Sequence, residues 1–152
     1  MVNYSFIRAD HRRMSDVFRL LKENNLEIDT TIEATLVAYD KDVLIGTCSY
    51  SDNVIKCFAV AKNHQGEGIG IQLISNIYKR IMDKGYDDVF VYTTQCNIEK
   101  FKSLGFDLLA KTGQGVALLE LGNDNITSHL EKTYQKLNIN QRNIASIIMN
   151  CN

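Results

Sequence analysis

A glycine-rich loop between an apolar strand and an amphipathic helix constrains this chain more than any other feature of its sequence. Residues Val54–Val60 are nearly all apolar, which is typical of a strand buried on both faces. The sequence Gln-Gly-Glu-Gly-Ile-Gly occupies positions 65–70, and apolar residues then recur at helical spacing from Ile71 to Met82. Gly85 stands where a left-handed residue would end that helix. A strand, a glycine loop and a long helix in this order predict an α/β domain.

Hydrophobic periodicity predicts further elements on both sides of this unit. They are a helix over residues 10–24, a hairpin of strands 35–39 and 43–50, a strand at Asp88–Thr94, a short helix over 97–104, and a second hairpin of strands 106–110 and 116–121. A helix over 126–137 and an apolar strand over 144–149 follow. The order of the core elements is therefore helix, hairpin, strand, glycine loop, long helix, strand, short helix and hairpin.

The loop has the composition of a phosphate cradle. The unpaired amides and the dipole at a helix N-terminus attract anions, and glycines let a phosphate approach the backbone closely. The dinucleotide fingerprint does not fit, because Ile71 stands where its third small residue belongs, and the Gly-Lys-Ser/Thr end of a P-loop is missing. On its own, the loop is equally compatible with a plain structural turn between a strand and a helix.

The context of the loop resembles a known superfamily. Gln65, Gly68 and Gly70 match the pattern Gln/Arg-x-x-Gly-x-Gly/Ala, and Asn97 and a Gly-Phe pair follow it in family-like order and spacing. Over roughly residues 35–121 the chain resembles the GNAT superfamily of N-acetyltransferases. The resemblance implies an α/β, acyl-CoA N-acyltransferase-like fold with a mixed central sheet flanked by helices. It also implies a bound CoA or dephospho-CoA-type pantetheine group.

That resemblance also assigns binding residues. Backbone groups of the strand before the loop would hold the pantetheine arm, amides of the loop and of the first helical turn would bind the pyrophosphate, and the segment that follows Asn97 would lie near the thiol. The residues so assigned are Cys57, Phe58, Ala59, Val60, Gln65, Gly66, Glu67, Gly68, Ile69, Gly70, Ile71, Asn97 and Phe101. No residue is assigned a catalytic role.

Two features depart from the usual amine acetyltransferase. Many members of the superfamily carry a tyrosine four residues before the glycine of the Gly-Phe pair, which protonates the departing thiolate, and this chain has Phe101 there. The strand before the loop offers no glutamate as a base. It offers only Lys56, expected as a solvated or phosphate-facing cation, and Cys57, expected to pack in the core. A thiol acceptor relaxes these requirements, because a thiol with a pKa of about 8.5 ionises more readily than an amine and is intrinsically nucleophilic.

A closer resemblance is to the citrate lyase ligase family. It is carried by residues 53–60, the glycine loop, Phe-Lys-Ser-Leu-Gly-Phe at 101–106, Ala-Leu-Leu-Glu at 117–120, and Ile-Ala-Ser-Ile-Ile-Met-Asn-Cys-Asn at 144–152. In that family a run similar to the last one leads into Pro-Phe-Thr-x-Gly-His, the start of a nucleotidyltransferase domain. The resemblance implies a GNAT-like domain over residues 1–140, followed at 141–152 by a linker and the first strand of a nucleotidyltransferase domain that is absent.

The citrate lyase ligase family implies an ATP-dependent, AMP-forming reaction. Acetate would be joined to the thiol of a dephospho-CoA-derived prosthetic group on the citrate lyase acyl carrier subunit. ATP would bind only the absent domain, while this chain would hold the pantetheine arm. Two alternatives stay open, a stand-alone N-acetyltransferase that uses acetyl-CoA on a small amine and a non-catalytic module that docks the carrier.

Composition excludes several other classes. A net charge of −1 gives no indication of nucleic-acid or acidic-membrane binding. No apolar run approaches the roughly 18 residues of a membrane span. The four cysteines are widely spaced and the three histidines share no metal-ligand spacing. We therefore expect reduced thiols, a cytoplasmic protein and no metal site.

Overall fold

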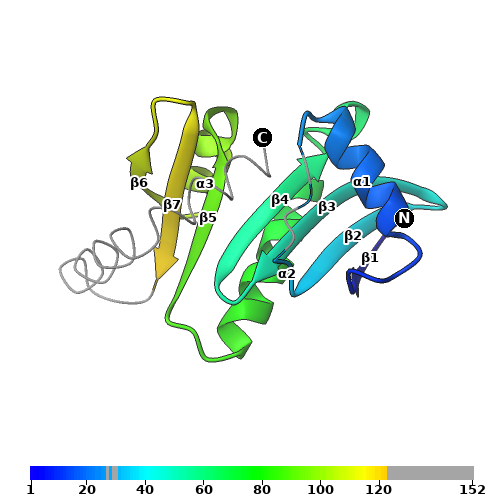
Figure 1. Ribbon diagram of the computed structural model, residues 1–152, viewed down its shortest axis with the longest axis horizontal. Helices are drawn as coiled ribbons and strands as arrows, with labels where there is room; N and C mark the ends of the chain where they lie inside the picture. The colour runs from blue at the N-terminus through cyan, green and yellow to red at the C-terminus, as the bar shows by residue number, and fades with distance from the viewer. Residues whose placement is uncertain (27, 29–30, 123–152) are drawn as a thin grey trace.

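The structure is a computed structural model that describes residues 1–26, 28 and 31–122. Within this part of the chain, seven strands form one mixed sheet in the order β1-β2-β3-β4-β5-β7-β6 (Figure 1). The strands are β1 (Val2–Ile7), β2 (Ala34–Asp40), β3 (Val43–Ser51), β4 (Val54–Val60), β5 (Asp88–Thr94), β6 (Asp107–Lys111) and β7 (Val116–Gly122). The helices are α1 (Met14–Glu23), α2 (Ile69–Asp83) and α3 (Ile98–Ser103), with short 3-10 turns at Lys62–His64 and Gln95–Asn97. The predicted mixed sheet flanked by helices is confirmed.

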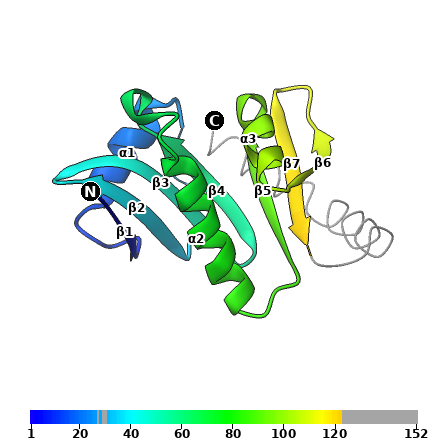
Figure 2. The same ribbon diagram turned by 180° about the vertical axis from the view of Figure 1, so that it is seen from behind.

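Two antiparallel halves of the sheet meet at a short parallel contact. β1 to β4 pair in sequence order, and β5 pairs with β7, which pairs with β6. Only β4 and β5 run parallel, and their register comprises Val54 opposite Phe90 and Ile55 opposite Val91. Beyond that contact the two strands diverge, which gives the sheet the open V shape visible in Figures 1 and 2.

The helices cover both faces of the sheet. On one face, α1 buries an apolar stripe against β2 and β4, and Cys57 and Ala59 of β4 belong to this core. On the other face lie α2 and α3 (Figure 2), and Phe58 and Val60 point into that second core. Alternate residues of β4 therefore enter opposite cores, as the period-two geometry of a strand requires. This explains why the strand is apolar throughout.

The first strand was not predicted. β1 alternates apolar Val2, Tyr4 and Phe6 with polar Asn3 and Ser5, which is a strand signal. It is an edge strand paired only with β2, and most of its residues are half-buried or exposed, so it lacks the continuous apolar run of a strand buried on both faces.

Three of the predictions concern residues that the structure does not describe. The predicted helix over 126–137, the strand over 144–149 and the domain boundary at residue 140 lie outside the described residues. No helix of the described part is long and apolar enough to cross a membrane. The same residues contain no group of three or more His, Cys, Asp or Glu placed to hold a metal ion.

The contact between α2 and β3 yields a stability prediction. A β-carbon on Gly46 would lie 2.9 Å from both Ile69 Cγ2 and Leu73 Cδ1, so an alanine there must displace these two buried side chains of α2. We expect Gly46→Ala to lower the free energy of unfolding by about 1–3 kcal/mol in urea denaturation. Gly113→Ala, where nothing lies within 4 Å, is the matched control and should change it by less than about 0.5 kcal/mol. Equal effects of the two substitutions would contradict the close packing of α2.

Candidate binding site between β4 and β5

A β-bulge in β4 creates the opening. Thr47 pairs with Ala59 and Ser49 pairs with Lys56, so two residues of β4, Cys57 and Phe58, face one residue of β3. Cys57 has a φ of 54°, in the left-handed region that non-glycine residues rarely adopt. Bulges bend a strand and increase its twist. β4 accordingly separates from β5 after Ile55. The later residues of β4 form no ladder with β5, although their backbone edge is on the β5 side.

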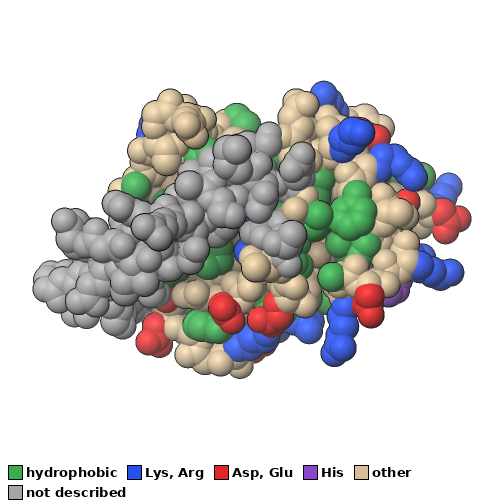
Figure 3. Space-filling view, viewed as in Figure 1, with side chains coloured by type: hydrophobic (Ala, Val, Ile, Leu, Met, Phe, Trp, Pro, Cys, Tyr) green, Lys and Arg blue, Asp and Glu red, His purple; other side chains and the backbone are tan. Residues whose placement is uncertain are grey.

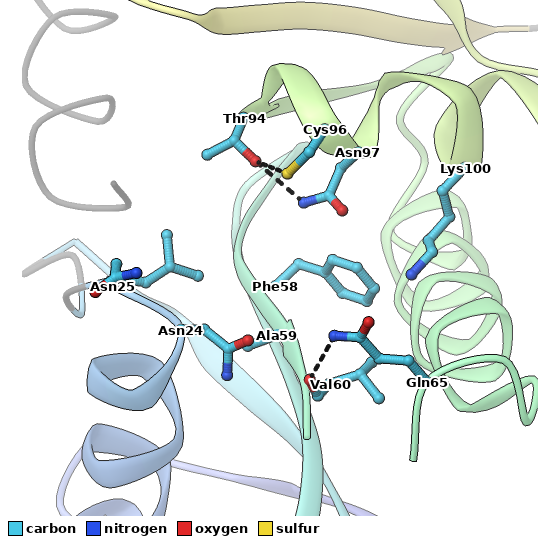
Figure 4. Close-up of a pocket in the computed structure, with 11 residues that line it drawn as sticks. Asn24, Asn25, Phe58, Ala59, Val60, Gln65, Thr94, Cys96, Asn97 and Lys100 are labelled. Carbon is cyan, nitrogen blue, oxygen red and sulfur yellow. Dashed lines mark hydrogen bonds between the residues drawn. The ribbon is translucent and has the colours of Figure 1, made fainter. Parts of the chain in front are cut away.

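The opening contains a groove of about 480 Å³ (Figure 4). This volume lies in the range of small-molecule pockets. One wall is formed by the residues that follow α1, the other by Gln65 before the loop glycines, the end of β5, the turn after it and α3, and the last residues of β4 lie between them (Figure 4). The lining residues are Asn24, Asn25, Leu26, Phe58, Ala59, Val60, Gln65, Thr94, Cys96, Asn97 and Lys100.

The loop presents backbone rather than side chains to solvent. Gly66 and Gly68 have φ values of 83° and 84°, and a β-carbon on either would meet nothing within 4 Å. Glycine is therefore required by the left-handed backbone and not by lack of space. Gly68 is the N-cap of α2, whose hydrogen bonds begin with Gln72 N donating to Gly68 O at 3.1 Å. The amides of the preceding helical residues thus have no intrahelical partner and point toward an approaching anion.

Gln65 ties this loop to the strand before it. Its Nε2 donates a hydrogen bond to the Val60 carbonyl at 3.3 Å. The only acid of the loop, Glu67, is exposed, and its Oε2 lies 2.9 Å from Nδ1 of His64. Neither Glu67 nor Ile71, which is also exposed, lines the groove.

Gly70 allows a close contact between α2 and β4. A β-carbon there would lie 2.9 Å from Phe58 Cζ and 3.5 Å from Lys100 Nζ. Phe58 in turn packs edge-on against Phe101 at 5.8 Å between ring centroids, and Phe101 packs against Phe106 at 5.4 Å. The absence of a side chain at position 70 therefore places the start of α2 directly on the Phe58 ring.

Two side chains differ from their predicted positions. Phe101 was assigned to the thiol end of the ligand, but it is 0% exposed and lies behind Phe58, because α3 turns it into the core. Lys56 was expected to be solvated or to face a phosphate. It is 3% exposed and donates hydrogen bonds to Thr31 O at 2.9 Å and Thr31 Oγ1 at 3.0 Å. The prediction that Cys57 packs in the core is confirmed.

The structure adds groove residues that sequence reasoning missed. Asn24 and Asn25 follow α1, Cys96 lies in the turn after β5, and Lys100 lies one helical turn after Asn97. Only Lys100 had a usable signal, because residues three apart share a helix face and Asn97 was already a candidate. The others come from segments that the fold alone brings to the groove.

The groove carries few groups for proton transfer. Asn97 Nδ2 donates a hydrogen bond to Thr93 Oγ1 at 3.1 Å. It donates another to Thr94 Oγ1 at 3.4 Å, and the Thr94 hydroxyl lies 3.0 Å from Cys96 Sγ (Figure 4). Among the described residues that line it, there is no carboxylate, imidazole or phenol. Tyr92, two residues before Thr94, is not a lining residue, and burial raises its pKa to about 12. The groove is built to hold and orient a ligand more than to move its protons.

Charge on the molecular surface is mixed. Figure 3 shows acidic and basic side chains interspersed over the half of the molecule that carries α1, in keeping with the net charge of −1. An anion would therefore be held by groups at the groove itself.

The acetyltransferase (GNAT) domain family matches residues 31–108, just over half of the chain. The chain belongs to the GNAT family. Solved structures share the fold of this GNAT domain. An acyl-CoA N-acyltransferase from Pseudomonas aeruginosa aligns with a TM-score of 0.67 at 13% identity, over 79% of this chain and 99% of that one. N-acetylglutamate synthase from Neisseria gonorrhoeae, complexed with coenzyme A and N-acetyl-glutamate, aligns with a TM-score of 0.63 at 16% identity, over 81% of this chain and 36% of that one.

Curated relatives of this GNAT domain are citrate [pro-3S]-lyase ligases. The ligase of Klebsiella pneumoniae is 27% identical over 94% of this chain and 42% of its own length. That of Haemophilus influenzae is 28% identical over 99% of this chain and 45% of its own length. The predicted resemblance to this family is confirmed, and the chain spans less than half the length of these relatives.

The bulge yields a matched pair of substitutions. Cys57 lies in the bulge, Cys48 is the residue of β3 opposite the bulge, and both side chains are buried, at 2% and 0% exposed. Replacement by glycine removes the same group at both sites, but only Cys57 has a left-handed backbone in which glycine is unstrained. We expect Cys48→Gly to lower the free energy of unfolding by at least about 1 kcal/mol more than Cys57→Gly does, measured in urea. Equal losses at the two sites would show that Cys57 is not strained.

Proposed function

We propose that this GNAT domain binds the pantetheine arm and the diphosphate of a CoA-type group in the groove between β4 and β5 and presents its thiol for acetylation. One observation carries the proposal. A loop of exposed glycine backbone at a helix N-terminus adjoins, through Gln65, a groove whose described lining holds no carboxylate, imidazole or phenol. Such a site suits an anionic ligand with a thiol that needs little help to ionise.

The residues of the groove fit a CoA-type group. The amides of Gly68, Ile69 and Gly70 at the start of α2 would hold the diphosphate. The β5-facing edge of the last residues of β4, outside the β4–β5 ladder, would hydrogen-bond the amides of the pantetheine arm. When bound, the group supplies the thiol that accepts the acetyl group.

The absence of a tyrosine at position 101 supports a thiol acceptor. An amine acceptor is protonated near neutral pH and must lose a proton before it attacks, whereas a thiol with a pKa of about 8.5 is already a few per cent thiolate. The buried Phe101 offers no proton to a leaving thiolate. Transfer to a thiol needs the arm to be held and oriented, which the groove residues can do.

We further propose that the domain acts within a citrate lyase ligase, as its similarity to ligases of that name supports. Acetate and ATP would give acetyl adenylate and pyrophosphate, and ATP would bind outside this domain. The thiolate of the carrier-bound prosthetic group would then attack the acetyl carbon, forming a thioester and releasing AMP, with the thiol proton passing to solvent. The acyl carrier subunit of citrate lyase is the proposed partner, and the cytoplasm is the proposed location.

Ligand binding tests the proposal directly. We expect isothermal titration calorimetry to show saturable binding of dephospho-CoA and CoA to the chain. Gly68→Trp should weaken binding at least about tenfold, because it forces a large side chain into a left-handed position at the N-cap of α2. Gly113→Trp, in the open turn between β6 and β7, should leave the affinity unchanged.

Other outcomes would favour the alternatives. If the chain binds neither ligand and Gly68→Trp has no effect on the intact enzyme, the proposal is wrong. A self-contained acetyltransferase is the second candidate, because the chain belongs to the GNAT family. Turnover of acetyl-CoA with a panel of small amines would support that reading. Capture of a carrier that lacks its prosthetic group would support a docking module.

Cys96 provides a reporter of occupancy. It is exposed and lines the groove, whereas Cys48 and Cys57 are buried. We expect N-ethylmaleimide to modify Cys96 faster than either buried cysteine, and saturating dephospho-CoA to slow that modification severalfold because the ligand occupies the same space. Peptide mass spectrometry follows each cysteine separately. A rate at Cys96 that the ligand does not change would place the bound arm elsewhere.

A further inference from the structure

Lys100 places a positive charge beside the start of α2. It lies on α3, is partly buried and lines the groove. Its Nζ lies 3.5 Å from the position that a β-carbon on Gly70 would occupy, so the ammonium stands next to the first turn of α2. Figure 4 shows its side chain directed from α3 toward Phe58 and the end of the groove where Gln65 lies.

The Lys100 ammonium has contacts that fix its position without neutralising it. It lies 5.2 Å from the centroid of the Phe58 ring, within the range of a cation–π interaction. The structure gives its side chain no ion pair and no hydrogen bond to any described residue. Lys84, in contrast, is paired with Glu33.

Lys100 is also the one charged side chain among the described residues that line the groove. This ammonium therefore lines an otherwise neutral groove and at the same time lies beside the first turn of α2. A helix N-terminus attracts an anion through partial charges, and a nearby ammonium adds a full charge and up to three donors.

We infer that Lys100 donates a hydrogen bond to the diphosphate of the CoA-type group and so sets the preference of the groove for diphosphate-bearing ligands. This inference rests on the proposed function, because it assigns a residue to the ligand proposed there. The loop amides hold the diphosphate from the α2 side, and Lys100 holds it from the α3 side. The bound ligand thereby connects α2 and α3 across the end of the groove.

The inference separates two parts of the ligand. Dephospho-CoA carries the diphosphate and the pantetheine arm, whereas pantetheine carries the arm alone. Loss of the Lys100 charge should therefore weaken the first ligand and leave the second unaffected. Charge-assisted hydrogen bonds are stronger than neutral ones, and they weaken as salt screens the charges.

The experiment compares Lys100→Gln with Lys102→Gln. Lys102 lies on the same helix, is exposed and does not line the groove, so the two variants carry the same change in charge. Calorimetry with dephospho-CoA and NMR titration with pantetheine would be performed on the whole chain. We expect Lys100→Gln to raise the Kd for dephospho-CoA about tenfold and to reduce its dependence on salt. The Kd for pantetheine should not change, Lys102→Gln should behave as wild type, and Lys100→Arg should recover most of the lost affinity.

The outcomes distinguish this inference from the function on which it rests. If wild type binds dephospho-CoA and Lys100→Gln binds it equally well, Lys100 is not a ligand of the diphosphate, and the proposed function stands. If Lys100→Gln weakens dephospho-CoA and pantetheine by the same factor, Lys100 acts on the arm through Phe58, and the inference is wrong. If wild type binds neither molecule, both the proposed function and the role of Lys100 fail.

Discussion

The groove depends on the bulge at Cys57 and Phe58, where two residues of β4 face one of β3. A left-handed backbone at a cysteine costs on the order of 1–3 kcal/mol and persists only where its surroundings hold it. Here the side chains alternate between the two cores, with Cys57 under α1 and Phe58 under α2, so the bent strand is held from both faces. If β4 were regular, it would continue to pair with β5. The backbone groups of β4 that face the groove would then be hydrogen-bonded to β5.

A second set of contacts relates the glycine loop to α3. Gly70 meets the Phe58 ring, Phe58 meets Phe101, and Phe101 meets Phe106, so a continuous apolar contact runs from the start of α2 to the start of β6. A tyrosine hydroxyl in the buried orientation of Phe101 would need a hydrogen-bond partner of its own. The phenylalanine removes a proton donor and completes a rigid support. That support sets the distance between the loop and Lys100.

The two ends of the groove differ in chemistry. Near Gln65 it has the ammonium of Lys100, which lies beside the start of α2, while the residues after α1 contribute neutral amides, and the end of β5 and the turn after it contribute a hydroxyl and a thiol. This arrangement matches an elongated ligand with an anion at one end and an uncharged nucleophile at the other. A GNAT fold without the usual proton donor is thus suited to holding a thiol arm, because the reaction of a thiol depends more on position than on acid–base catalysis.

The sequence alone determined the features that depend on neighbouring residues. The apolar run at Val54–Val60, the amphipathic pattern of α2 and the glycines of the loop each follow from local geometry. Together they predicted an α/β domain and the candidate phosphate site, and the resemblance to a known family added the specific fold. Only the tertiary structure decided features that depend on distant partners. Lys56 is buried because the segment before β2 supplies acceptors for it, and Phe101 is buried because α3 packs against the sheet. The asparagines after α1 reach the groove because the bulge turns β4 away from β5. Periodicity reports which face of an element is apolar, but not which elements meet across a cleft, since that depends on how the sheet bends.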